Sequence, residues 1–168
     1  MINFLKTKIA LLWAKKHTQN AEIYKQNAAA DQEKLLFSLL KTAENTLFGK
    51  EHHFGEIQSV RDFQEKVPIS DYEDLKPYIE RIKNGEKDIL WTSLPEYFAK
   101  TSGTTSGAKY IPISKEGMPY QIAAAQSAIF HYIAQKDNAD FVVGKMIFLQ
   151  DSPKLEEINS IKTGRLSG

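Results

Sequence analysis

A run of small, hydroxylated residues separates two short apolar segments and constrains how the chain between them folds. Seven of the nine residues in TSGTTSGAK (101–109) are glycine, serine or threonine. The flanking segments, YFA (97–99) and YIPI (110–113), are short and contain residues that favour strands. We therefore expect two strands with a loop between them.

Helical periodicity dominates the sequence before this loop. Apolar side chains recur every three or four positions between residues 35 and 47, which predicts an amphipathic helix. Asp31 is the expected N-cap of this helix and Gly49 its expected stop. At the N-terminus, lysines flank an apolar centre and predict another amphipathic helix. We favour a helix docked on the domain, with a position on a membrane surface as the alternative.

Two shorter helices are predicted from their start signals. One starts after Ser59 and ends before the next proline. The other starts with a capping box formed by Ser70 and Glu73, and its apolar face begins at Tyr72. Gly85 lies just beyond its last apolar position, where a left-handed residue commonly ends a helix.

A helix and a strand are expected after the loop. Ser114 is the expected cap of the helix, whose buried stripe includes Ile122, Ile129 and Ile133. The segment KMIFL (145–149) is predicted to be a buried strand. Helices followed by strand, loop, strand, helix and strand favour an α/β fold, with α+β as the alternative.

The length and composition of the chain suit an ordinary globular domain. The sequence has 168 residues, of which 42% are hydrophobic and 26% charged. Residues 1–90 are expected to be mainly helical, and residues 91–168 to be α/β with the loop among them. Residues 161–168 follow an expected turn and are interpreted either as a flexible tail or as a chain cut within a fold.

Charge and cysteine content exclude several classes of function. The formal net charge is +1, so bulk charge does not favour a nucleic acid as partner. The sequence contains no cysteine, which excludes a disulfide framework, a thiolate zinc site and a cysteine nucleophile, and suits a cytoplasmic protein. His52 and His53 are adjacent rather than spaced as metal ligands, so we predict a solvated loop there and no metal site.

The loop has the chemical groups that phosphate binding requires. Glycines let backbone N–H groups approach an anion, hydroxyl groups add donors, and Lys109 supplies a positive charge. Gly103 and Gly107 have three residues between them where a Walker loop has four, and Tyr110 stands where that loop has serine or threonine. The dinucleotide pattern is absent as well. Composition alone leaves a phosphate loop and an ordinary surface loop equally open.

TSGTTSGAK resembles the signature of the acyl-adenylate-forming, firefly luciferase-like superfamily, whose usual form is close to TSGTTGxPK. The extra Ser106 and the Ala108 before Lys109 depart from that form. With the ending KYIP (109–112), they resemble the auxin-responsive acyl acid–amido synthetase family, a branch of that superfamily. The preceding VPISDYEDLKPYIERIKNGEKDILW (67–91) resembles the same branch.

The resemblance implies a ligase that uses ATP and Mg²⁺ to adenylate a small carboxylic acid and then transfers the acyl group to an amine, often that of an amino acid. By its position in the motif, Lys109 is the implied catalytic residue and would offset charge on the leaving pyrophosphate. The implied nucleotide-binding residues are Ser102, Gly103, Thr104, Thr105, Ser106 and Gly107.

Members of this family are severalfold longer than this chain, and their other nucleotide contacts lie beyond the motif. The resemblance therefore implies that residues 1–168 are an incomplete N-terminal portion of an adenylating domain, which alone should not catalyse the full reaction. A non-catalytic nucleotide- or acyl-binding module and a structural or interaction domain remain as alternatives. The sequence specifies neither the acid, nor the acceptor, nor the oligomeric state.

Overall fold

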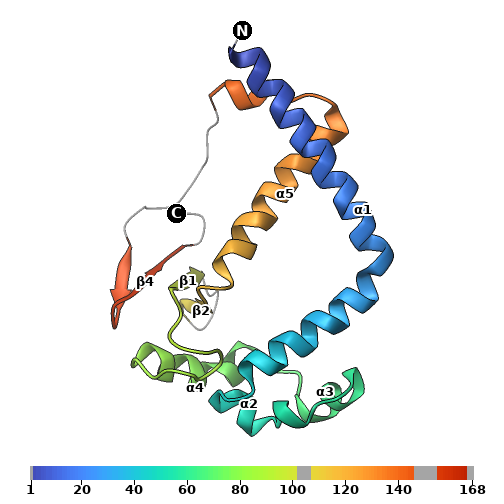
Figure 1. Ribbon diagram of the computed structural model, residues 1–168. Helices are drawn as coiled ribbons and strands as arrows, with labels where there is room; N and C mark the ends of the chain where they lie inside the picture. Colours follow the sequence, from blue (N-terminus) through green and yellow to red (C-terminus); the bar gives the residue numbers. More distant parts are fainter. Residues whose placement is uncertain (1, 102–106, 146–154, 166–168) are drawn as a thin grey trace. The chain divides into compact units, whose positions relative to one another are not determined.

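The computed structural model describes residues 2–101, 107–145 and 155–165. Within these residues the chain forms helices and one mixed sheet, which confirms the expected α/β class (Figure 1). The helices are α1 (Ile2–Ala43), α2 (Leu47–Glu51), α3 (Val60–Lys66), α4 (Tyr72–Lys83) and α5 (Met118–Lys136), with 3₁₀ turns η1 (Phe54–Glu56) and η2 (Asp140–Val143). The strands are β1 (Tyr97–Thr101), β2 (Lys109–Ile113), β3 (Glu156–Ile158) and β4 (Ile161–Gly164).

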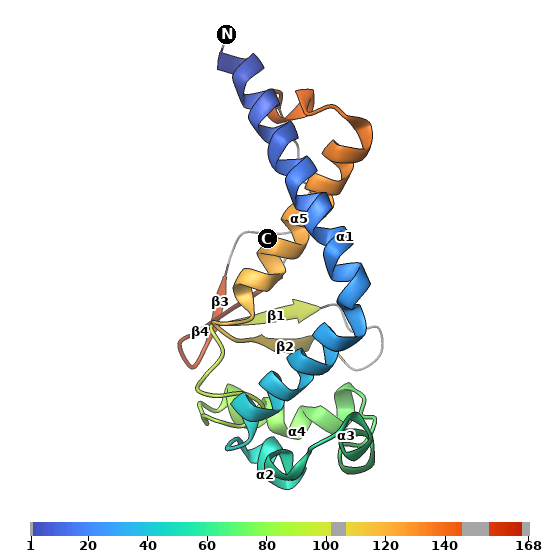
Figure 2. The same cartoon turned by 45° about the vertical axis from the view of Figure 1, so that its right-hand side comes forward.

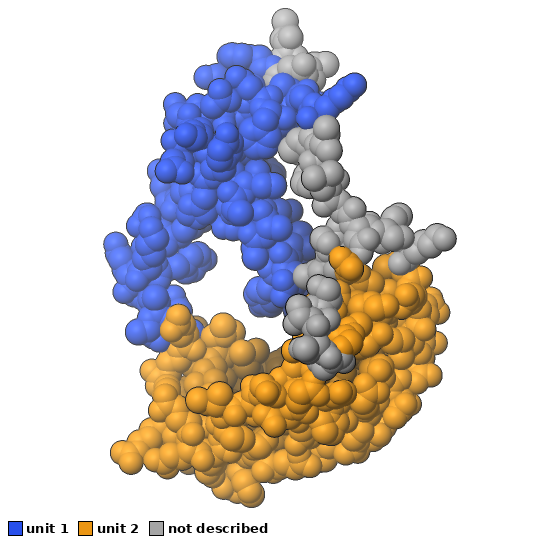
Figure 3. All heavy atoms as spheres, turned by 180° about the vertical axis from the view of Figure 1, so that it is seen from behind, with its two compact units in different colours: residues 1–31, 116–149 blue, residues 32–115, 150–168 orange. Residues whose placement is uncertain are grey.

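The chain divides into two compact units, which Figure 3 shows in different colours. Unit 1 contains residues 1–31 and 116–149, and unit 2 contains residues 32–115 and 150–168. The first part of α1 therefore belongs to unit 1 together with α5, and its last part belongs to unit 2. The sheet, α2, α3 and α4 all lie in unit 2.

α1 is one continuous helix, so the predicted helix start at Asp31 is wrong. No glycine or proline occurs between residues 2 and 43 to interrupt the helix. The three alanines before Asp31 have the highest helix propensity of any residue, and they carry the helix through this position.

Gly49 lies inside α2 and does not stop a helix as predicted. Thr46 caps α2: its hydroxyl accepts a hydrogen bond from the Gly49 N–H at 3.0 Å and donates to the Ala43 carbonyl oxygen at 2.7 Å. A Cβ atom on Gly49 would lie 2.1 Å from that carbonyl oxygen. The glycine is therefore required by the close approach of two backbone segments.

In unit 2 the predicted N-cap of α3 is confirmed, whereas the predicted N-cap of α4 is one residue too early. Ser59 caps α3 as predicted, and its hydroxyl accepts a backbone N–H of the first turn at 3.0 Å. In α4 the cap is Asp71 rather than Ser70, and Asp74 completes the capping box. The end of α4 is as predicted, because Gly85 adopts a φ of +89° just after it.

The predicted helix after the loop is present as α5, but its details differ from the prediction. α5 begins at Met118, with a proline in its first turn, so Ser114 is not its cap. Ile133 is buried, whereas Ile122 and Ile129 are exposed. The predicted stripe fails at these two positions because the core of unit 1 gathers only around the C-terminal part of α5.

The strands form one four-stranded sheet in the described residues, with the order β2-β1-β4-β3. β1 pairs antiparallel with β2 and parallel with β4, and β3 pairs antiparallel with β4. Residues 161–164 are therefore a sheet strand, and interpreting them as a flexible tail is wrong. In the predicted strand 145–149, Lys145 is outside any strand and residues 146–149 lie outside the described residues.

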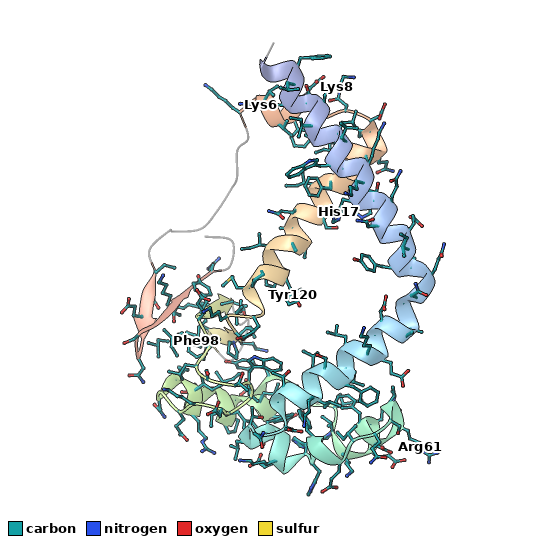
Figure 4. All side chains as sticks on the ribbon, viewed as in Figure 1. Lys6, Lys8, His17, Arg61, Phe98 and Tyr120 are labelled. Carbon is teal, nitrogen blue, oxygen red and sulfur yellow. The ribbon has the colours of Figure 1, made fainter. Side chains whose placement is uncertain are left out.

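The core of unit 2 lies between the sheet and α4. Phe98 of β1 is fully buried there, and Figure 4 shows it among closely spaced side chains. Apolar residues from α4, the connection that follows it, β1 and β4 supply this cluster. Its buried members are Ile79, Ile82, Ile89, Phe98 and Ile161.

The core of unit 1 joins the first part of α1 to the end of α5. Its buried members are Ala14, Ile133 and Ala139. His17 of α1, labelled in Figure 4, makes a hydrogen bond with the Ser127 hydroxyl of α5 at 2.8 Å. Among the helices described, none combines the length and the apolar character that crossing a bilayer demands.

Candidate functional site

The candidate site lies where the β1–β2 hairpin ends. β1 ends at Thr101, β2 begins at Lys109, and these two residues are direct antiparallel partners (Figure 2). The Cα atoms of such partners lie about 4.5–5.5 Å apart. The sheet thus holds the two ends of the predicted phosphate loop side by side.

Two of the predicted site residues, Gly107 and Lys109, fall within the described part of the chain. Gly107 has a φ of +87°, in the left-handed region that favours glycine. Nothing lies within 4 Å of the position that a Cβ atom would take there, so conformation rather than crowding selects glycine. The other predicted site residues lie outside the described residues: Ser102, Gly103, Thr104, Thr105 and Ser106.

Lys109 is half-buried and lies against an aromatic ring of α4. Its ammonium nitrogen is 5.0 Å from the centroid of the Tyr72 ring, within the range of a cation–π interaction. Within the described residues, no carboxylate forms an ion pair with Lys109. Its positive charge is therefore held by a neutral group and is not cancelled.

Tyr72 also contacts the backbone beside Lys109. Its hydroxyl oxygen accepts a hydrogen bond from the Tyr110 N–H at 2.9 Å. The sequence pattern placed Tyr72 only on the apolar face of its helix and gave no indication of this bond. The contact joins residues 38 positions apart, so no local signal reveals it.

A second lysine, Lys83 of α4, contacts the same strand through the ring of Tyr110. The ammonium nitrogen of Lys83 lies 4.7 Å from the Tyr110 ring centroid, and the Phe98 ring meets Tyr110 edge-on at 6.2 Å. The start of β2 is therefore held from α4 and from the core at once. Figure 1 shows α4 next to the β1–β2 hairpin in unit 2.

Lys100, on the strand opposite, differs from Lys109 in its electrostatic surroundings. Its ammonium nitrogen lies 3.0 Å from Oε2 of Glu156 on β3. The hydrogen bond with Glu156, followed by the attraction between their charges, raises the pKa of Lys100. Lys100 thus forms an ion pair within the sheet, whereas no carboxylate of the described residues forms one with Lys109.

The described residues contain no group of three histidine, cysteine, aspartate or glutamate side chains placed to hold a metal ion. Near the two adjacent histidines, Glu56 pairs with Lys66 at 2.6 Å and with His53 at 3.3 Å. The hydrogen bond from Lys66 is the main reason why the pKa of Glu56 is lowered. Glu56 and Lys66 therefore form an ion pair at the surface.

Comparison with known proteins relates most of the chain to one family. The model of the GH3 family N-terminal domain matches residues 17–165. The solved structure titled AtGH3.15 acyl acid amido synthetase in complex with 2,4-DB is similar with a TM-score of 0.76 and 22% identity, over 89% of this chain and 26% of that one. This likeness shows a shared fold.

Curated relatives match shorter stretches. The chain is 36% identical over 95 residues to indole-3-acetic acid-amido synthetase GH3.2 of Arabidopsis thaliana, a match that covers 55% of this chain and 17% of that protein. It is 45% identical over 64 residues to probable indole-3-acetic acid-amido synthetase GH3.13 of Oryza sativa subsp. japonica, covering 37% of this chain and 14% of that protein. The matched part is thus a small share of each relative's length.

Proposed function

The chain belongs to the GH3 family, as the resemblance of its loop predicted, and on this premise we propose that it carries the phosphate-binding loop of an ATP-dependent acyl acid amido synthetase. In the proposed reaction, a carboxylate oxygen attacks the α-phosphorus of ATP, and pyrophosphate leaves. An amine, such as that of an amino acid, then attacks the acyl carbon of the acyl-adenylate, and AMP leaves. The observation that carries this proposal is the loop TSGTTSGAK held at its base by the Thr101–Lys109 pair.

Lys109 is proposed to stabilise the charge that develops on the leaving pyrophosphate. A cation aimed at developing charge accelerates a reaction most when it is positioned in advance, because no reorganisation is then required during the reaction. Two observations support this role: Lys109 lies at the first position of a paired strand, and its ammonium group lies against the Tyr72 ring.

The rest of the loop is proposed to supply donors to the phosphate oxygens. Gly107 adopts a left-handed conformation, and alternation of such residues with right-handed neighbours turns successive N–H groups toward an anion. The hydroxyl groups of the loop would add further donors. The proposed nucleotide-binding residues are Ser102, Gly103, Thr104, Thr105, Ser106 and Gly107.

Mg²⁺ is proposed to accompany ATP, where it would neutralise part of the charge on the phosphates. Protein sites for this ion commonly supply one or two carboxylates and leave the remaining positions to phosphates and water. We assign no ligand residue to the ion. We further propose a cytoplasmic setting, which the absence of cysteine supports.

Isothermal titration calorimetry with Mg·ATP tests the proposed nucleotide site. Lys109→Ala should weaken binding about tenfold or more, because a charge-assisted hydrogen bond contributes about 1.5–3 kcal/mol. Lys50→Ala is the matched control, since it removes the same charge from an exposed position on α2 and should leave the affinity unchanged. Equal affinities of the wild type and Lys109→Ala, or no binding at millimolar ATP, would favour a structural or interaction domain instead.

A further inference from the structure

Tyr72 holds both the side chain and the backbone at the start of β2. Its ring lies 5.0 Å from the Lys109 ammonium nitrogen, and its hydroxyl oxygen accepts the Tyr110 N–H at 2.9 Å. We infer that Tyr72 is a positioning residue that fixes the Lys109 ammonium group at the base of the loop. The inference rests on the proposed function in one respect, the identity of the ligand that Lys109 binds.

Tyr72 is itself held in place by the start of α4 and by the core. Tyr72 is the first residue of α4, directly after the N-cap Asp71, whose side chain accepts the Asp74 N–H at 3.1 Å. Asp74 in turn accepts the Asp71 N–H at 2.9 Å. The ring of Tyr72 packs against the buried core of unit 2. A side chain that is placed by a capping box and by the core provides a rigid support for a site residue.

The hydrogen bond from Tyr110 gives a partner to an N–H group that an edge strand leaves unpaired. β2 is at the edge of the sheet, so alternate N–H groups point away from β1 and have no partner within the sheet. The N–H of Tyr110 is such a group, and the Tyr72 hydroxyl accepts it. This bond fixes the distance between α4 and the residue next to Lys109.

An aromatic ring holds a lysine without neutralising it. A carboxylate in the same place would cancel the charge, as Glu156 does for Lys100 on β1. The Tyr72 ring contacts one side of the ammonium group and leaves N–H donors on the other side for phosphate oxygens. Because a free lysine side chain samples many rotamers, restraining it in advance reduces the entropy lost on binding.

NMR of ¹³C-labelled lysine in the full chain tests the ring contact directly. The Lys109 ε-CH₂ signals, assigned by their loss in Lys109→Arg, should lie upfield of those of exposed lysines because of the Tyr72 ring current. Tyr72→Phe should keep this shift and Tyr72→Leu should abolish it. Wild-type Lys109 signals at the position of exposed lysines, or signals unchanged in Tyr72→Leu, would overturn the inference.

Tyr78→Leu is the matched control for these variants. Tyr78 lies on the same helix and packs against the same core, but its hydroxyl donates to Glu51 at 2.5 Å. Tyr78→Leu should keep the upfield shift of Lys109, because the recorded ring contact of Lys109 is with Tyr72 and not with Tyr78. Loss of the shift in Tyr78→Leu as well would attribute the effect to general loosening of α4 and would overturn the inference.

Hydrogen exchange of the Tyr110 amide tests the second contact. Tyr72→Phe removes the acceptor and keeps the ring, so the amide should exchange about fivefold faster, the ratio that one hydrogen bond provides. Tyr78→Leu should leave this rate unchanged. An unchanged rate in Tyr72→Phe would show that the hydroxyl does not hold β2.

Mg·ATP affinity separates the positioning role from the proposed function. Tyr72→Leu should weaken binding about two- to fivefold, and Tyr72→Phe should restore it, because the ring alone holds the cation. If no variant and no wild type binds ATP, the proposed function fails while the NMR shift still decides the positioning role. If Lys109→Ala weakens binding and Tyr72→Leu does not, the positioning role fails while the proposed function stands.

Discussion

The two units of the chain differ in the size of the side chains that they bury. Unit 2 buries a phenylalanine, Phe98, together with isoleucines from α4, β4 and the connection after α4. Unit 1 buries Ile133 with two alanines, Ala14 and Ala139. Burying a large apolar side chain contributes far more to stability than burying an alanine, because the contribution follows the apolar area removed from water.

The unit with the smaller core also exposes more large apolar side chains. Unit 1 leaves large apolar side chains in solvent on both of its long helices, including Leu12 and Trp13 on α1 and Tyr120 on α5. Tyr120, labelled in Figure 4, is 75% exposed. The proposed phosphate loop is thus attached to the unit with the larger core, where Lys109 can be held in a fixed position.

Phe98→Ala should produce the largest effect and tests the assignment of the core of unit 2. Phe98 is fully buried, so its truncation should lower the free energy of unfolding of unit 2 by about 3–5 kcal/mol. Urea unfolding followed at amide signals of unit 2 measures this loss. Ile69→Ala is the control, because Ile69 is fully exposed and should change stability by no more than about 0.5 kcal/mol. Equal effects of the two substitutions would contradict the assignment of the core.

Ile133→Ala should have a smaller effect, confined to unit 1. We expect a loss of about 2 kcal/mol, at the lower end of the range for such a truncation, because its buried neighbours are small. Hydrogen exchange should accelerate at the packed ends of α1 and α5 and stay unchanged in the sheet. The control is Ile129→Ala on the same helix, which removes a side chain that is already exposed. If exchange accelerated equally in both units, their stabilities would not be separate.

Acid should reveal the smallest difference, through the ion pair of Lys15 and Asp137 in unit 1. The hydrogen bond from Lys15 lowers the pKa of Asp137 below 3.8, its ordinary value. The stabilisation is therefore present above about pH 4 and is lost as the pH falls through the folded-state pKa. Asp137→Asn should remove this acid dependence from the thermal unfolding of unit 1, and asparagine tolerates the φ of +50° found there.

Glu86→Gln is the matched substitution in unit 2. The hydrogen bond from Arg81 lowers the pKa of Glu86, so this variant should reduce the acid dependence of unit 2 and leave that of unit 1 unchanged. Both effects should be small because the side chains of both pairs are largely in solvent. Asp137→Asn with an unchanged pH profile of unit 1 would show that its ion pair makes no contribution.

The parts of the fold that were predictable depend on local signals. Strand-forming residues on both sides of a run of glycine, serine and threonine predicted β1 and β2, because both propensity and loop composition act over a few residues. Ser59 and Gly85 were recognised because helix ends use side chains and conformations of restricted kinds. The loop motif predicted the family for the same reason.

The parts that were missed depend on contacts between distant residues. β4 is recognisable only from its parallel pairing with β1, in which Tyr97 faces Lys162. Gly49 matters because the Ala43 carbonyl approaches it in space, and a local pattern suggested a helix stop instead. The role of Tyr72 depends on a hydrogen bond to a residue on another element, so its periodic position could indicate only burial.

We propose above all that Lys109 and the loop before it bind the phosphates of ATP. The most direct measurement is a titration of the ¹³C-lysine-labelled chain with Mg·ATP, followed at the Lys109 ε-CH₂ signals. We predict a saturable shift of these signals with ATP and with pyrophosphate, and none with adenosine. Lys109 signals that stay unchanged up to millimolar ATP would contradict the claim.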